Sequence, residues 1–226
     1  MKRVPVGLKA LIGAIAVGVL FVLSTTAFAS HSWNDYHWAG DGTTVSPTVV
    51  DDTSSSLYDV TAGVDEWAGL GTRIQPTITT ASKGNITVKE AFSPFWYGLA
   101  RIFVEDGHIT KGEVKLNTRL LASKGEDAAD HVLCQELGHV LGLGHNRDSL
   151  TTCMNDTATL GSATSPNTHD TQQLTSIYGH LDAAAPTTDD GGGGGGGGPP
   201  CDKKPDHPKC QSSNGVWITV HVFWVE

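Results

Sequence analysis

The stretch from residue 134 to 145 constrains the fold of this 226-residue chain more than any other, and it reads Cys-Gln-Glu-Leu-Gly-His-Val-Leu-Gly-Leu-Gly-His. Apolar residues recur at three- and four-residue spacing around it, which predicts a helix over about 127–141. Gln135 and His139 lie one helical turn apart, so their side chains point the same way and can share a metal ion.

Further residues extend this constellation. Glu136 is rotated by about 100° from Gln135, so it could reach water at a metal ion without being a ligand. Gly142 is a natural helix end because glycine accepts the left-handed conformation, and the turn would bring His145 to the same point. Met154 stands where a second turn could run beneath such a site.

Glu-x-x-His-x-x-Gly-x-x-His followed by a methionine resembles the metzincin zinc endopeptidases, nearest their matrixin-like branch. The resemblance covers about residues 30–182 and is strongest over 98–155. It implies an α+β fold with a twisted mixed sheet, an active-site helix, a methionine turn and a C-terminal helix.

The resemblance also implies the roles of the motif residues. The cofactor would be Zn²⁺, held by Gln135, His139 and His145. Glu136 would be the catalytic residue that takes a proton from water, and Met154 would form the methionine turn.

The segment around 99–104 falls where the family has its substrate-binding edge strand. The residues of that edge would be Leu99, Ala100 and Arg101. The resemblance therefore implies a protein or peptide as the substrate.

One position departs from the family pattern, because Gln135 stands where the first zinc-binding histidine is expected. A neutral amide oxygen binds zinc less readily than an imidazole nitrogen. Gln135 is then a weak third ligand, or a histidine from elsewhere completes the site, or the site is degenerate. The candidates for such a histidine are His31, His37 and His108.

These alternatives give different functions. The first is a zinc-dependent metalloendopeptidase that hydrolyses peptide bonds with Glu-activated water. The second is a catalytically silent metzincin-fold module that binds peptides or acts at a surface, because Gln135 replaces a histidine. A purely structural secreted domain leaves the Glu, His, Gly and Met pattern unexplained.

The chain divides into four parts. Residues 1–29 have a basic start, an uncharged apolar run over 10–23 and an Ala-Phe-Ala exit, which is typical of a signal peptide. A retained membrane anchor fits less well because a spanning helix needs about 20 apolar residues. The metzincin-like catalytic domain would occupy 30–182, followed by a Gly/Pro-rich linker at 183–200 and a disulfide loop and strand at 201–226.

Composition limits the partners. The leader holds three of the 15 basic residues and no acidic ones, so the remaining chain has 12 basic against 24 acidic residues. That balance argues against a nucleic-acid partner. No later segment is long and apolar enough to span a membrane. We expect a secreted, extracellular monomer.

The cysteines agree with export, because four are present and an oxidising compartment allows two disulfides. They are Cys134, Cys153, Cys201 and Cys210. Three pairings are open on paper, and the local one, 134 with 153 and 201 with 210, closes short loops. A four-cysteine zinc site lacks the Cys-x-x-Cys spacing that such sites use.

Periodicity predicts the remaining elements of an α+β domain. Helices are expected over 57–69, 127–141 and 168–181, and strands over 74–79, 85–92, 99–104 and 113–117. A turn at 105–107 would join the last two strands. The apolar, aromatic segment 216–225 is also strand-like, and either docks on the main domain or pairs with another chain.

Overall fold

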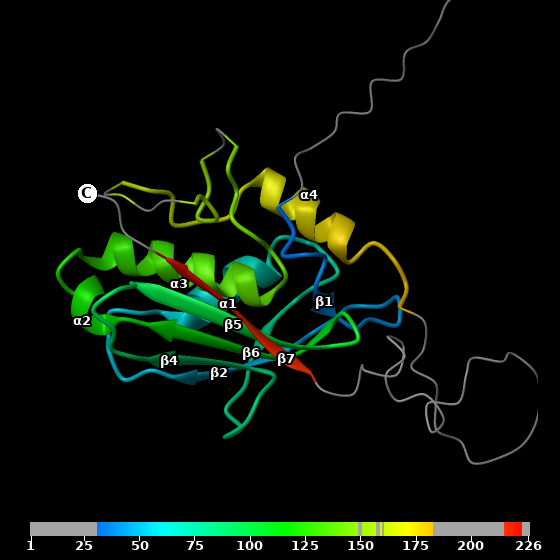
Figure 1. Ribbon diagram of the computed structural model, residues 1–226, viewed down its shortest axis with the longest axis horizontal. Helices are drawn as coiled ribbons and strands as arrows, with labels where there is room; N and C mark the ends of the chain where they lie inside the picture. The colour runs from blue at the N-terminus through cyan, green and yellow to red at the C-terminus, as the bar shows by residue number, and fades with distance from the viewer. Residues whose placement is uncertain (1–30, 149–150, 157–158, 160, 183–214, 223–226) are drawn as a thin grey trace, which may run out of the picture.

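The computed structural model describes residues 31–148, 151–156, 159, 161–182 and 215–222, which form a mixed sheet with a few helices (Figure 1). The strands are β1 His37–Trp38, β2 Thr48–Asp52, β3 Thr77–Ile78, β4 Ile86–Glu90, β5 Gly98–Glu105, β6 His108–Leu116 and β7 Val216–Val222. The helices are α1 Val60–Ala68, α2 Thr118–Leu121, α3 Glu126–Val140 and α4 Thr168–Ile177.

The strand order across the sheet is β3-β2-β4-β6-β5-β7, with β1 paired beside the start of β6. Strands β2, β3, β4 and β6 run parallel, whereas β5 is antiparallel to β6 and β7 is antiparallel to β5. A two-residue turn joins β5 to β6. Asp106 and Gly107 both have positive φ there, which matches the twist of a tight hairpin. The turn places His108 at the first position of β6.

Helix α3 packs against β5 and β6 on one side and against α1 on another. It is buried on nearly every side from Ala128 onward, as expected for a helix enclosed by other elements rather than lying at a surface. Trp67 of α1 contributes to this packing, since its indole Nε1 donates to the carbonyl of Cys134 at 3.1 Å. The core therefore surrounds the helix that carries the 134–145 motif.

Several element boundaries differ from the predicted ones. Helix α1 begins at Val60 with Asp59 as its N-cap, because the residues before it form strand β2 and a connecting turn. Strand β6 begins at residue 108 rather than 113, since the tight turn lets pairing start at once. Helix α4 ends at residue 177 rather than 181, where the chain turns toward β1.

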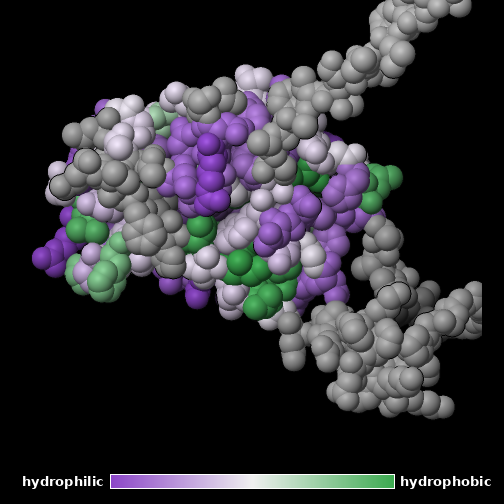
Figure 2. All heavy atoms as spheres, turned by 45° about the horizontal axis from the view of Figure 1, so that its top comes forward, coloured by the Kyte–Doolittle hydropathy of each residue, from purple (hydrophilic) through white to green (hydrophobic). Residues whose placement is uncertain are grey.

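Some predicted features lie outside the described residues, namely the leader 1–29, the linker 183–200 and the cysteines at 201 and 210. Among the described helices, none combines the length and apolar composition needed to cross a membrane. Figure 2 shows one face of the molecule, which is largely hydrophilic with small separate apolar patches.

Candidate metal centre

The end of α3 and the turn after it bring two histidines together. The helix closes at Leu141, and Gly142 follows with φ of 101°, a conformation that favours glycine. A side chain at Gly142 would also overlap the carbonyl oxygen of Tyr36. The resulting turn places the His145 ring 4.7 Å from the His139 ring, with an interplanar angle of 75°.

His139 offers a free lone pair. Its Nδ1 lies 2.8 Å from the carbonyl oxygen of Leu143, which only accepts, so Nδ1 carries the proton. Its Nε2 is buried and has no hydrogen-bond partner among the described residues. Burial, with a smaller contribution from His145, lowers the pKa of His139 to about 3. The ring is therefore neutral, as a metal ligand must be.

His145 is oriented in the same manner. Its Nδ1 lies 2.9 Å from the Asp156 carboxylate, and its Nε2 is buried without a hydrogen-bond partner in the described part of the chain. Burial lowers the pKa of His145 while Asp156 acts in the opposite direction. A carboxylate on the far nitrogen is the usual way to aim an imidazole at a metal.

Gln135 presents its amide oxygen. The amide nitrogen donates to the carbonyl of Asn155, so the oxygen faces the other way. That oxygen is buried, with no hydrogen-bond partner among the residues described. One helical turn separates Gln135 from His139, so the oxygen projects from the same side of α3 as the imidazole.

Glu136 is a fully buried carboxyl beside β5. A side chain at Gly98 would overlap its Oε1, so glycine is what allows the close approach of helix and strand. Neither oxygen has a regular hydrogen bond within the described residues. Burial raises the pKa of Glu136 well above its usual range, and the backbone of Ala100 opposes this only in part. A buried carboxyl without partners is costly and indicates a functional role.

The segment that holds Met154 is fastened beneath α3. A disulfide joins Cys134 to Cys153, with their Cα atoms 6.0 Å apart. Met154 is fully buried, and a side chain at Gly138 would overlap its sulfur. The segment is thus held against the part of α3 that carries Gln135 and His139.

These donors fit a zinc-type ion. Among the buried polar atoms that lack partners within the described residues, three are suited to bind a metal together, namely Gln135 Oε1, His139 Nε2 and His145 Nε2. Zinc accepts nitrogen and oxygen donors, and catalytic zinc sites use three protein ligands with a fourth position open. The amide oxygen is the weakest of the three donors.

The histidines considered as substitutes for Gln135 make their contacts elsewhere. His31 Nε2 lies 3.0 Å from Asp170 Oδ1, and its ring stacks on His169. His37 and His108 gather around Asp182 (below). Each of these two sets has the composition and spacing to hold a metal ion.

The predicted edge residues lie on β5, where Leu99 and Ala100 are buried and Arg101 is half-buried. Arg101 pairs with Glu113 of β6. The outer side of β5 is paired with β7 along its length. The C-terminal segment therefore docks on the main domain, one of the two outcomes left open by its sequence.

Sequence reasoning did not single out Asp156, Asn155 or Gly98 as parts of this site. Asp156 and Asn155 follow the methionine directly, but an acid or amide in a loop carries no spacing pattern. Gly98 matters only because Glu136 packs against it from a distant helix. Such contacts become visible only once the helix and strand are placed.

Comparisons with known proteins add little. No family model matches the chain, and no curated protein matches it either. Among solved structures, its fold is similar to a structure of myroilysin, with 11% sequence identity and a TM-score of 0.44. The match covers 66% of this chain and 98% of that chain.

Proposed function

We propose that this chain is a secreted, metzincin-like zinc metalloendopeptidase. The observation that carries the proposal is the pair of adjacent histidines, His139 and His145, whose Nε2 atoms are buried and have no partner among the described residues. The buried, unpaired carboxyl of Glu136 on the same helix supports it. The disulfide between Cys134 and Cys153 agrees with an oxidising compartment, hence with export.

Gln135, His139 and His145 would hold the zinc ion. When bound, it would supply a positive charge that polarises a peptide carbonyl and lowers the pKa of water. Asp156 and the carbonyl of Leu143 keep the two imidazoles in the required orientation, since each faces an Nδ1 atom. The disulfide and Met154 keep this loop against α3.

Glu136 would perform the proton transfer. Its carboxylate takes a proton from the attacking water and passes it to the leaving amine. Both carboxyl oxygens are buried without a hydrogen-bond partner among the described residues, so they are available for this transfer. Gly98 lets the carboxyl sit directly beside β5.

The substrate would be an extended peptide. A peptide can add to the free edge of a sheet through main-chain hydrogen bonds, and β5 is the strand beside Glu136. Leu99, Ala100 and Arg101 would form that edge. In the described structure β7 pairs with this edge.

The test is cleavage of casein by the purified, exported chain. Cleavage is expected to be lost with a chelator, restored by zinc and abolished in Glu136→Gln, whereas zinc content in that variant stays unchanged. Glu126→Gln is the matched control, since it makes the same change at an exposed position of α3. Absence of cleavage with excess zinc would contradict the peptidase proposal. It would favour the catalytically silent peptide-binding module, which the neutral amide of Gln135 in place of a histidine supports.

A further inference from the structure

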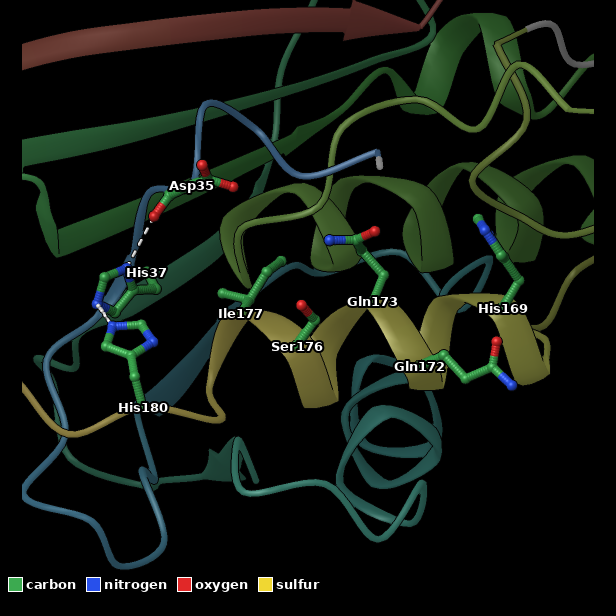
Figure 3. A pocket seen from close by; sticks show the side chains of 8 residues that line it. All are labelled: Asp35, His37, His169, Gln172, Gln173, Ser176, Ile177 and His180. Carbon is green, nitrogen blue, oxygen red and sulfur yellow. Dashed lines mark hydrogen bonds between the residues drawn. The ribbon is translucent and has the colours of Figure 1, made fainter. Parts of the chain in front are cut away.

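A second cluster of metal-ligating side chains lies where the beginning and the end of the segment 31–182 meet the start of β6. Asp182 Oδ1 is 3.0 Å from His37 Nε2, and it is 3.2 Å from the Nε2 atoms of both His108 and His180. These residues come from β1, from the start of β6 and from the segment after α4. Figure 3 shows His37 and His180 facing each other at one end of α4.

The spacing of these atoms matches a zinc coordination sphere. With metal–ligand bonds of about 2.0–2.1 Å, neighbouring ligands of a tetrahedral ion lie roughly 3.3 Å apart. Asp182 Oδ1 lies 3.0 Å from His37 Nε2 and 3.2 Å from His108 Nε2, which agrees with this value. The donor atoms of His37, His108 and Asp182 all lie within 4.8 Å of one another.

Hydrogen bonds alone account poorly for this arrangement. His37 Nδ1 lies 2.8 Å from the carbonyl oxygen of Asp35, which only accepts, so in the neutral ring the proton sits on Nδ1. The lone pair of Nε2 then faces a carboxylate oxygen and another imidazole nitrogen. In addition, three imidazoles converge on one oxygen that has two lone pairs. A bound cation removes both conflicts.

The surroundings fix the donors in place. The other oxygen of Asp182 accepts from the backbone amide of Gly40, so the carboxylate cannot turn away. The bond from His37 Nδ1 to a backbone carbonyl is the second contact that metal-binding histidines usually make. The Asp182 side chain is 13% exposed and that of His180 is 51% exposed, so the cluster is held firmly yet open on one side.

We propose that His37, His108 and Asp182 bind a second divalent ion of the zinc class, with His180 lying beside them. The ion would join the first strand of the domain to the β5–β6 turn and to the segment after α4. The proposal does not depend on the peptidase function.

Metal content tests the site. The full exported chain, stripped with a chelator and reloaded with zinc, is expected to retain one more equivalent than Asp182→Asn or His108→Ala. Loaded wild-type protein is also expected to melt at a higher temperature than either variant. Asp41→Asn is the matched control, because Asp41 is exposed and its side chain accepts hydrogen bonds from Thr43, away from the cluster. Equal zinc content in wild type and both variants would overturn the proposal.

Two further variants guard against misfolding of Asp182→Asn and separate this site from the candidate catalytic centre. His37→Ala removes one nitrogen donor, so it tests the site even if Asp182→Asn does not fold, and Co²⁺ absorption reports the loss of that ligand. His139→Ala addresses the candidate catalytic centre. Zinc lost in Asp182→Asn but kept in His139→Ala supports the second site and contradicts the first, so the two proposals fail separately.

A separate observation concerns the edge of β5. Strand β7 pairs with it from Gly98 opposite Val222 to Val104 opposite Val216. Trp217 anchors the pair, since its ring lies 5.3 Å from the Phe103 ring and 4.4 Å from the Arg101 guanidinium. With β6 on one side and β7 on the other, β5 has no open edge over this length.

We infer that β7 is a built-in competitor for peptides at β5. Its last residues lie opposite Gly98, the residue that packs on Glu136. An extended peptide could pair with this strand only after β7 leaves. This inference rests on the proposed function for its biological meaning, but occupation of the edge can be tested without catalysis.

The probe is a fluorescent synthetic peptide with the sequence of residues 214–224, added to the full chain. Ile218→Pro disrupts strand pairing of β7 and is expected to permit binding, whereas wild type and the control Ile218→Val bind at least tenfold more weakly. Equal binding by all three proteins would contradict the competitor. Peptide binding in Ile218→Pro without any casein cleavage would support the competitor and contradict the peptidase.

Discussion

Position 135 decides how strongly the candidate centre binds metal. Its amide nitrogen is committed to the carbonyl of Asn155, so the side chain can offer only its oxygen. That oxygen is neutral and is a weaker zinc ligand than an imidazole nitrogen. The side chain is 1% exposed, so it has little freedom to move aside. Gln135 therefore predicts a labile ion rather than a tightly held one.

Gln135→His is expected to raise zinc affinity by about 10- to 100-fold, because a second imidazole would stand one turn from His139. Competition with a chromogenic chelator measures this, and casein cleavage at limiting zinc should increase in parallel. Gln135→Ala should lower both. Tighter binding in wild type than in the histidine variant would mean that another residue completes the site, and equal affinity in all three proteins would mean that position 135 does not face the ion.

Among the elements, the three central strands of the sheet are joined by one carboxylate. Glu113 of β6 pairs with Lys89 of β4 and with Arg101 of β5, and it lies 3.4 Å from Lys115. Burial alone would raise the pKa of Glu113, but these cations outweigh it and the pKa is lowered. The carboxylate is thus favoured in the folded state.

Glu113→Gln is expected to lower the free energy of unfolding at pH 7 by about 1–2 kcal/mol, moderated because its partners are about a third exposed. The folded pKa lies below the unfolded value of about 4.3, so this stability is present above that pH. It is lost as pH falls through the folded pKa, and the two proteins should converge there. Urea unfolding across pH measures the difference. A constant gap at all pH values would contradict the assignment, with Glu126→Gln as control.

For the whole molecule, the disulfide reduces the number of conformations of the unfolded chain and also holds the site in place. Cys134 and Cys153 are 19 residues apart, and both are buried. Closing a loop of this size removes conformational entropy from the unfolded state. The same bond also fastens the Met154 segment to α3, so global stability and site geometry are linked.

The double variant Cys134→Ala/Cys153→Ala is expected to lose about 3 kcal/mol of unfolding free energy, since an unfolded chain without the bond has more conformations. Urea unfolding with a chelator present measures this apart from any metal effect. Wild type with its disulfide reduced should match the variant. Unchanged stability in both would mean that the bond acts only locally.

The local features of this protein follow from its amino-acid order. Helical periodicity places Gln135, Glu136 and His139 within one turn of α3, and Gly142 ends that helix. Period-two runs locate β4 and β5 to within a few residues. These features could be predicted because a helix turn, a strand or a glycine turn depends on neighbours a few positions away.

Contacts between residues that are distant in the chain depend on how the complete elements pack. Asp182 gathers His37 and His108 from 145 and 74 positions earlier in the chain, and β7 pairs with β5 across the linker. Asp156 orients His145, and the missing side chain of Gly98 leaves room for the Glu136 carboxyl. No local pattern predicts such contacts, because they arise from packing of complete elements around a shared core, where burial selects the partners.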